Sequence, residues 1–576
     1  MKKILLSIVS VCLMAGCSES FLDTDNLIKK DSSNFPVSTE DAEQILTGLY
    51  RPAMGNSDVP YANSFFVAEM MSDERFGGGG SDDRDAQAVA AFMKTNENMY
   101  SSYWSMRWQG IYRCNFMLKV EEQIAWDSED IHNRIIGETY FMRAYYYFEL
   151  ARAFGNIPLV LTPDPVNNPQ ADPADVYGQI ASDLLKAIDL MPAKPHADLN
   201  GVGTDGHATK WAAQALLARA FLFYTGYYGA ESITLPEEGG TVTKADVVAQ
   251  IDNCIANSGH DLLPEFRNLW PYSAAKDYKY KEDNGLDWVG DCSAWEHYRD
   301  NPEPVFVIKH SGNNYTGRNL ECLFFSPRYQ GDGSPTGTWA DCYPFGQGWG
   351  GGLVTRNIYD TWPANDPRRT GSILNMDDPA ENVTYYDGMQ NQVQDTHLFN
   401  KKYIAISTKA DDPTFSNGGV GTGNIPLYWY LYPEFEAALD YMSNNLQDFF
   451  VIRFSDVLLM GAELGSSNAQ TYMDRVRARV GLDPVPATLE NIKNERRWEL
   501  AFEGIRYFDL LRWHDEKLIT EHRSDVEVYN QGIKTKISVP FRAETKGFLP
   551  IPDEEIQRSE GTLVQNAGWA SNEGNY

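Results

Sequence analysis

Residues 495–513 form the stretch that most strongly specifies this fold, and they read ERRWELAFEGIRYFDLLRW. The large apolar residues recur at three- and four-residue steps, as on one face of an amphipathic helix, at Trp498, Phe502, Ile505 and Phe508. Glu503 and Asp509 each lie three residues from Arg506, close enough for charges to pair along a helix face. Paired charges beside an apolar stripe predict a packed scaffold helix, so we expect a structural role rather than ligand contact.

Helical periodicity also dominates residues 38–263. It predicts helices over residues 39–50, 100–122, 130–154, 173–190, 207–228 and 244–256. Gly155 and Pro192 are stop signals at the ends of two of them. Helix pairs in series indicate tetratricopeptide-like packing, and residues 136–140 fit the core of that repeat, although no 34-residue period runs through the chain. We expect helix again from residue 449 onward.

Residues 264–447 interrupt this helical pattern with frequent Gly, Pro, Asn and Asp. Short β-like runs such as residues 305–308 occur there, and a loop-rich segment of this length is usually functional. Residues 270–362 hold six of the 14 Trp and eight of the 32 Tyr, more than double the density elsewhere. Aromatic rings stack on sugar faces while polar groups bind the rim, but Trp and Tyr also dominate protein interfaces. Both interpretations stay open, and many of these rings will belong to the core.

The N-terminus has the pattern of an export signal. Lys2 and Lys3 precede an apolar run over residues 4–14, which is too short to span a bilayer. Residues 13–17 read LMAGC and resemble the lipobox of bacterial lipoproteins, in which the cysteine is acylated. We therefore expect cleavage after residue 16 and lipidation of Cys17. No later stretch approaches 18 apolar residues, so the lipid would be the only membrane anchor.

The net charge limits the partners of this protein, and the cysteine count leaves its disulfides open. The formal net charge is −31, a polyanion that repels phosphate backbones, so nucleic acid is a poor partner. Export permits disulfides, but five cysteines would remain unlipidated and their pairing stays open, at Cys114, Cys254, Cys292, Cys322 and Cys342. A buried thiol is the simpler interpretation of Cys114, because it lies in an apolar helical pattern.

Four ordered blocks resemble the SusD/RagB family of outer-membrane nutrient-binding lipoproteins. F-x-x-R-x-x-D-x-x-L-M-x-A-E spans residues 450–463, and R-x-R-x-G-L spans residues 477–482. The stretch at 495–513 follows, and L-P-I-P-x-x-E-I closes the series at residues 549–556. Residues 137–160 and the start after Cys17 also match, so the resemblance covers essentially the whole mature chain.

This resemblance implies a mainly α protein, a tetratricopeptide-like helical-hairpin scaffold with a large irregular ligand-binding region. We expect a signal peptide over residues 1–16, helical regions over residues 17–263 and 448–576, and the ligand-binding region over residues 264–447. Family members bind oligosaccharides or similar nutrients at the cell surface and pass them to a SusC-like TonB-dependent outer-membrane transporter. They are binding proteins and not enzymes. Arg496 and Arg497 would then serve folding or partner contact.

The resemblance also suggests ligand-contacting residues. A tryptophan at the Gly348-Trp349 position joins the stacking arc of the family, and residues 313–317 resemble a loop that supplies a second ring. Residues 72–76 match a block before a ligand-facing loop, although Phe76 and a glycine run at 77–80 stand where a tryptophan is expected. The candidate stacking rings are Trp349, Tyr315, Phe76, Trp339 and Tyr343. The candidate hydrogen-bonding residues are Asn313, Asn314, Asp73, Arg75 and Arg328.

Other classes of protein stay open. A glycoside hydrolase needs two carboxylates about 5–10 Å apart, and none of the 80 acidic residues stands out. A helical-repeat scaffold that binds only protein is the other alternative. No nucleotide, hydrolase or histidine metal motif occurs, so we expect no catalytic residue and no cofactor. We expect no metal site; Asp377, Asp378 and Glu381 could hold calcium, but they lack EF-hand spacing.

The Cys17 hypothesis predicts that Cys17→Ser releases the protein from membranes, because the acyl chains are the only apolar anchor in the sequence. Fractionation of wild type and variant checks this, and Cys12→Ser is the matched control that should stay bound. A Cys17→Ser protein that stays in the membrane fraction through high-salt washing would contradict lipid anchoring.

Overall fold

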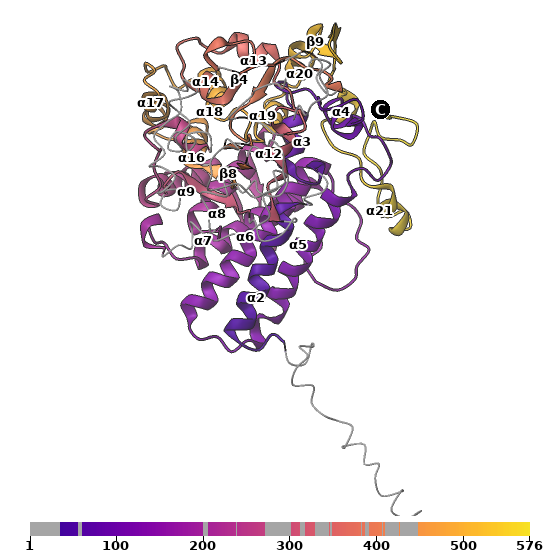
Figure 1. Ribbon diagram of the computed structural model, residues 1–576. Helices are drawn as coiled ribbons and strands as arrows, with labels where there is room; N and C mark the ends of the chain where they lie inside the picture. The colour runs from indigo at the N-terminus through magenta and orange to yellow at the C-terminus, as the bar shows by residue number, and fades with distance from the viewer. Residues whose placement is uncertain are drawn as a thin grey trace, which may run out of the picture.

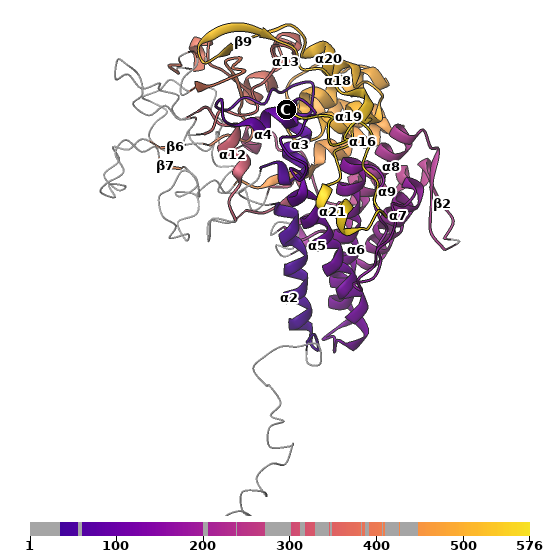
Figure 2. The ribbon, with the colours of Figure 1, turned by 90° about the vertical axis from the view of Figure 1, so that its right-hand side faces the viewer.

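The computed structural model describes residues 35–576, with gaps at 56–59, 200–205, 238, 271–300, 311–316, 329–344, 346–347, 382, 386, 388–390, 406, 409–424 and 427–446. Helices of the N-terminal half form the lower part of the molecule in Figures 1 and 2, where α2, α5 and α6 run side by side. Short elements of the middle region and the C-terminal helices form the upper part. The mainly α class expected from the sequence is confirmed.

Six helices build the lower part, and each predicted segment is confirmed. They are α2 (Thr39–Tyr50), α5 (Ser101–Val120), α6 (Glu129–Phe154), α7 (Pro173–Leu190), α8 (Lys210–Tyr228) and α9 (Lys244–Asn257). From α5 onward each helix packs against the next along the chain, as in a series of helical hairpins. Shorter elements between them are α3 (Ser64–Met70), α4 (Arg84–Ala90) and the hairpin of β1 (Ser232–Thr234) and β2 (Thr241–Thr243).

Local capping explains these boundaries. The Ser128 side chain accepts a hydrogen bond from the Ile131 amide at the start of α6, and Thr243 forms a capping box with Asp246 at the start of α9. Gly155 ends α6 with a φ of 70°. A Cβ on Gly110 of α5 would lie 2.3 Å from the Tyr146 ring, so this glycine lets α5 and α6 approach closely. None of the helices in the described ranges is long and apolar enough to cross a membrane.

The middle region contains only short elements in its described parts. The helices there are α12 (Leu320–Phe325), α13 (Arg356–Thr361) and α14 (Arg368–Ser372). The strands are β3 (Pro304–Ile308), β4 (Ile373–Asn375), β5 (Leu398–Asn400), β6 (Ser407–Thr408) and β7 (Ile425–Pro426). β4 pairs with β5 and β6 with β7, both antiparallel. The expected β-like run at 305–308 is confirmed as part of β3.

The C-terminal region begins with a strand and not with the expected helix. Residues 449–453 form β8 (Phe449–Arg453), which pairs antiparallel with β3, and α16 (Phe454–Glu463) starts only after it. Aromatic and β-branched residues favour a strand once a partner strand is available, and β3 supplies that partner. The remaining elements are α17 (Ala469–Arg479), α18 (Leu489–Glu499), α19 (Arg506–Arg512), α20 (Lys517–His522), β9 (Val526–Asn530), β10 (Ile533–Ile537) and α21 (Asp553–Arg558).

The stretch at 495–513 is not one helix, which corrects the sequence prediction. α18 ends at Glu499 and α19 starts at Arg506, with Phe502 at φ 64° and Gly504 at φ 72° between them. The Gly504 amide donates to Glu69 Oε1 of α3 at 2.8 Å. This hydrogen bond joins the segment between α18 and α19 to the N-terminal half of the chain. Of the four residues in the predicted stripe, Phe502 and Phe508 are buried, whereas Trp498 and Ile505 are only half-buried.

A buried charge network surrounds Arg453 at the end of β8. Its guanidinium contacts Glu499 at 2.5 Å, Glu503 at 2.7 Å and Glu303 at 2.8 Å. We call these four residues, together with Arg479, Arg368 and Lys402, the Arg453 network. Arg479 pairs with Glu303 and Glu499, Arg368 with Glu499, and Lys402 with Glu503. Burial alone would raise the pKa of Glu499, but Arg479, Arg453 and Arg368 hold it well below its ordinary value.

A second buried cluster joins residues 73–74 to the C-terminal helices. Asp73 accepts two hydrogen bonds of 2.9 Å from Arg506 and one of 2.8 Å from His522. Glu74 pairs with Arg497 at 3.0 Å. We call these five residues the Asp73 cluster. Arg506 therefore pairs across the fold, and not with its helix neighbours Glu503 and Asp509 as the spacing predicted; these acids pair instead with Arg453 and Arg496.

Arg453→Met should lower the free energy of unfolding by about 3–5 kcal/mol, because it leaves buried carboxylates without their cation. The matched control is Arg475→Met, which removes a partly exposed arginine paired with the exposed Asp261 and should cost less than about 1 kcal/mol. Chemical denaturation checks both values. Equal effects of the two substitutions would contradict a scaffold role for the Arg453 network.

Glu74→Gln should change how stability depends on pH. Burial and the negative charge of Asp73 raise the pKa of Glu74 from 4.5 to about 7. Between these two values the folded protein holds a proton that the unfolded chain releases, so this contribution to stability is lost as the pH rises through 7. The variant should therefore gain stability over wild type between pH 4.5 and 7, by up to about 3 kcal/mol.

Unfolding by urea at pH 5, 6, 7 and 8 measures that difference. Glu490→Gln is the control, an exposed glutamate at the start of α18 that should track wild type at every pH. A difference between Glu74→Gln and wild type that stays constant with pH would contradict the raised pKa of Glu74.

Candidate functional site

Two glycine-rich segments, residues 77–80 and 348–352, lie against each other and form a backbone surface that we call the glycine platform. The Gly79 amide donates to Gly350 O at 2.7 Å, and the Gly352 amide donates to Gly77 O at 2.9 Å. At one edge the Phe76 amide donates to Leu353 O at 2.8 Å. Segments more than 260 residues apart in the sequence are therefore paired by their main chains.

The platform requires glycine because neighbouring groups fill the space where side chains would stand. A Cβ on Gly78 would lie 2.0 Å from Leu353 Cδ2, and one on Gly351 would lie 2.0 Å from Phe324 Cε1. Gly78 and Gly350 also have φ values of 62° and 68°, which side chains disfavour. The glycine run that departs from the family pattern is thus a packing requirement of this loop pair.

Trp349 is the aromatic residue carried by the platform. Its ring is half-buried and meets Phe324 edge to face, with centroids 6.4 Å apart and planes at 84°. The Trp349 amide donates to Leu323 O at 2.9 Å, which fixes the backbone against α12. Among the described residues no hydrogen bond involves the indole N–H. The ring is therefore packed against α12 and keeps part of its surface exposed, as a stacking contact with a ligand requires.

Arg328 and Asp83 lie beside Trp349 and hold the platform in place. Arg328 Nη1 donates to Trp349 O at 3.0 Å and to Asp83 Oδ2 at 3.2 Å. Asp83 Oδ2 also accepts from the Gly80 amide at 2.6 Å. Both side chains are partly exposed, so Arg328 keeps its place as a candidate, and Asp83 is a residue that the sequence analysis missed. Its only signal was its position three residues after the glycine run.

Two glutamines, Gln392 buried and Gln394 half-buried, complete the platform, and the sequence analysis missed them too. Gln392 Nε2 donates to Gly350 O at 2.6 Å, and Gln394 Oε1 accepts from the Gly78 amide at 2.9 Å. The amide-rich run at residues 390–394 was the available signal for them.

Three candidates from residues 72–76 are buried inside the protein, which corrects their proposed roles. Asp73 belongs to the Asp73 cluster. Arg75 binds Glu69 at 2.9 Å and Gly352 O at 2.6 Å, and its guanidinium lies over Phe502. Phe76 has no exposed surface, so it cannot offer a face to a ligand. All three side chains are fully buried, so we no longer propose them as ligand contacts.

The other candidates lie outside the described residues. They are Tyr315, Trp339, Tyr343, Asn313 and Asn314. Cys17 also lies outside them, as do Cys292 and Cys342, whereas Cys114, Cys254 and Cys322 are free buried thiols. The calcium alternative loses support, because Asp377 binds Arg356 and His397 while Glu381 binds Lys401.

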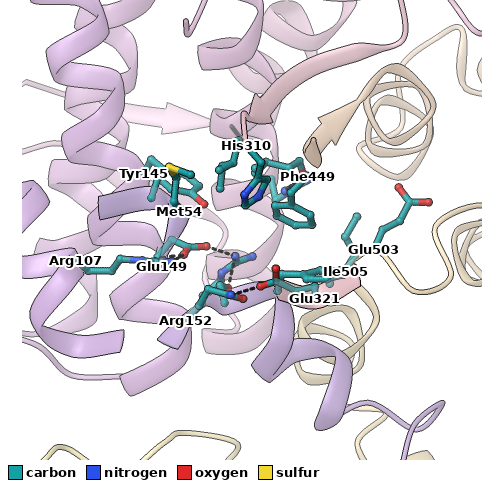
Figure 3. Close-up of a pocket in the computed structure, with 18 residues that line it drawn as sticks. Met54, Arg107, Tyr145, Glu149, Arg152, His310, Glu321, Phe449, Glu503 and Ile505 are labelled. Carbon is teal, nitrogen blue, oxygen red and sulfur yellow. Dashed lines mark hydrogen bonds and ion pairs between the residues drawn. The ribbon is translucent and has the colours of Figure 1, made fainter. Parts of the chain in front are cut away.

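A small cavity lies between the lower helices and the β3–β8 pair. Its volume is about 30 Å³, which is room for one or two water molecules and not for a sugar. Figure 3 shows Arg107 and Arg152 converging on Glu149 at one wall, with Glu321 and His310 nearby. Burial would raise the pKa of Glu149, but the two arginines hold it below its ordinary value. The charged residues that line this cavity pair with one another within the scaffold.

Comparison with protein families gives two matches to this chain. The model described as the SusD family matches residues 302–569. A second model, described as starch-binding and associating with outer membrane, matches residues 20–222. Together the two models cover most of the chain.

Similar proteins agree with these matches. SusD-like protein P2 of Formosa agariphila is 23% identical, covering 99% of this chain and 100% of the relative. A SusD-like protein of Bacteroides ovatus is 24% identical, over 89% of this chain and 82% of the relative. These relatives carry no enzyme name.

Solved structures agree as well. A laminarin-binding SusD-like protein matches with a TM-score of 0.66 and 26% identity, over 92% of this chain and 100% of that one. Surface glycan-binding protein A from Bacteroides thetaiotaomicron, in complex with laminarihexaose, has the same TM-score and coverage at 19% identity. The chain belongs to the SusD family of outer-membrane-associated proteins, and the solved structure that is 26% identical to it is that of a laminarin-binding protein.

Proposed function

We propose that this protein is a cell-surface lipoprotein that binds an oligosaccharide without cleaving it and delivers it to a SusC-like TonB-dependent transporter. The observation that carries this proposal is the half-exposed Trp349 ring, held on the glycine platform in a chain of the SusD family. Binding and delivery need a rigid, open surface and no reacting groups. Anchoring through Cys17 would keep that surface at the outer membrane.

The platform would hold Trp349 in place for contact with the flat face of a sugar ring. The glycines at 77–80 and 348–352 are themselves buried, so they position Trp349 and do not face a saccharide. The C–H face of the sugar would stack on the indole, and Arg328 and Asp83 would bind hydroxyl groups at the edge. Tyr315, Trp339, Tyr343, Asn313 and Asn314 remain proposed as further contacts in this region.

The ligand we propose first is a neutral glucan oligosaccharide. The laminarin-binding SusD-like protein is 26% identical to this chain over nearly all of both chains, which makes laminarihexaose the first probe. The net charge of −31 disfavours a strongly anionic glycan, because the long-range field of the protein would repel it.

Delivery to a transporter can be tested independently of ligand identity. The lipidated protein, purified from outer membranes in mild detergent, should retain a TonB-dependent β-barrel protein as its stoichiometric partner. Recovery of the protein alone, from membranes in which the barrel is present, would contradict the delivery role while leaving the binding role in place.

Trp349→Ala should weaken binding of laminarihexaose about thirtyfold, because a central stacking ring contributes about 2 kcal/mol or more. The thermal transition should move little, since the ring is partly exposed to solvent and is not part of the fully buried core. Trp126→Ala is the matched control, a half-buried tryptophan between α5 and α6 that should leave affinity unchanged. Titration calorimetry and differential scanning calorimetry give the two readouts.

Two results would overturn the proposal in different ways. If Trp349→Ala unfolds the protein, the ring is part of the core and the site lies elsewhere. If wild type incubated with the saccharide produces new reducing ends, the protein is a hydrolase and the binding role is wrong.

A further inference from the structure

A second concave surface lies between α5, the segment of residues 158–168 and α21. Its volume is about 580 Å³, within the range of small-ligand sites and far larger than the internal cavity. We call it the α5–α21 groove. None of its lining residues belongs to the glycine platform. Figures 1 and 2 place α21 apart from α12, the helix against which Trp349 packs.

Two tryptophans of α5 line one wall of the groove. Trp104 and Trp108 are four residues apart, so they lie on one face of the helix. Trp104 is buried and Trp108 is half-buried. Trp108 packs against Trp104 with ring centroids 5.7 Å apart. Among the described residues its indole N–H finds no hydrogen-bond acceptor.

Polar groups on the opposite wall are held in fixed orientations. Asn167 Nδ2 donates to Ser559 O at 2.9 Å, and Asn168 Nδ2 donates to Leu159 O at 2.7 Å. Because both amide nitrogens are bound to the main chain, both side-chain oxygens have set positions and remain acceptors. Ser105 and Glu560 add exposed polar groups at the rim. An aromatic wall facing oriented acceptors is the chemistry that recognises a neutral saccharide.

We propose that the α5–α21 groove is a second saccharide-binding site of this protein, for the same neutral class of glycan as the platform. The ligand class rests on the proposed function, whereas the location does not. The groove is concave and mixed in polarity, which suits a few sugar units better than the broad apolar patch of a protein interface. Once a long glycan is bound at one site, the other site meets it at a high effective concentration. Two sites on one chain would therefore hold the glycan for longer.

Filling the groove tests this without removing any core residue. Ser105 is an exposed residue of α5 that lines the groove, and Ser105→Arg places a long side chain there. Ser467→Arg is the matched control, an exposed serine before α17 with the same change of charge. Wild type and variants are titrated with a panel of neutral hexasaccharides that includes laminarihexaose. Hydrogen exchange with bound saccharide follows peptides 103–112 and 555–563.

Wild type should bind two equivalents of a panel member and protect both peptides from exchange. Ser105→Arg should lose one equivalent and that protection, Trp349→Ala should lose the other equivalent, and Ser467→Arg should lose neither. A single equivalent that Trp349→Ala weakens and Ser105→Arg leaves intact overturns the second site while the proposed function stands.

Other outcomes separate the two proposals further. A single equivalent lost only in Ser105→Arg supports the groove and removes the platform from the proposed function. No binding to any member of the panel overturns both. If Ser105→Arg lowers recovery of the β-barrel partner and leaves saccharide binding unchanged, the groove is a protein contact and the second site is wrong.

Discussion

Buried charge compensation around Arg453 is the constraint on which the rest of this structure depends. A guanidinium with no access to water is tolerable only when carboxylates surround it, and here they come from separate parts of the chain. Glu303 precedes β3, Glu499 ends α18 and Glu503 lies in the break before α19. Because these groups must meet, β3 has to pair with β8 and the 495–513 stretch has to bend.

The Asp73 cluster extends the same principle toward the candidate site. Arg506 and Arg497 neutralise Asp73 and Glu74, and the next residue, Arg75, reaches the main chain of the glycine platform at Gly352. The charged residues of the family blocks thus build the scaffold and its link to the surface. This explains why residues that look reactive in the sequence are buried and paired, while the platform leaves one ring, Trp349, partly exposed.

The loops that carry Trp349 are held in a fixed shape by their own hydrogen bonds. The platform is irregular, yet its main-chain groups are paired with one another or with Gln392 and Gln394, so its shape does not depend on a bound ligand. A side chain on Gly78 or Gly351 would collide with Leu353 or Phe324, so the close packing of the two loops beneath Trp349 depends on these glycines. The helices of the N-terminal half form a rigid frame. Hydrogen bonds and ion pairs between distant parts of the chain hold the loops against it.

Local patterns in the sequence were enough to predict the helices of the N-terminal half and the loop-rich middle region. They also identified the family and Trp349 as a candidate ligand contact. Caps, stops and apolar periodicity act within a few residues, so α2, α5, α6, α7, α8 and α9 could be predicted almost to the residue. Tertiary structure alone decided that residues 449–453 are a strand, because β3 lies some 150 residues away. It also decided that Arg506 pairs with Asp73 and that Arg75 and Phe76 are directed inward. Spacing along one helix cannot reveal such contacts, since charge pairing and close packing depend on distance in space and not on distance along the chain.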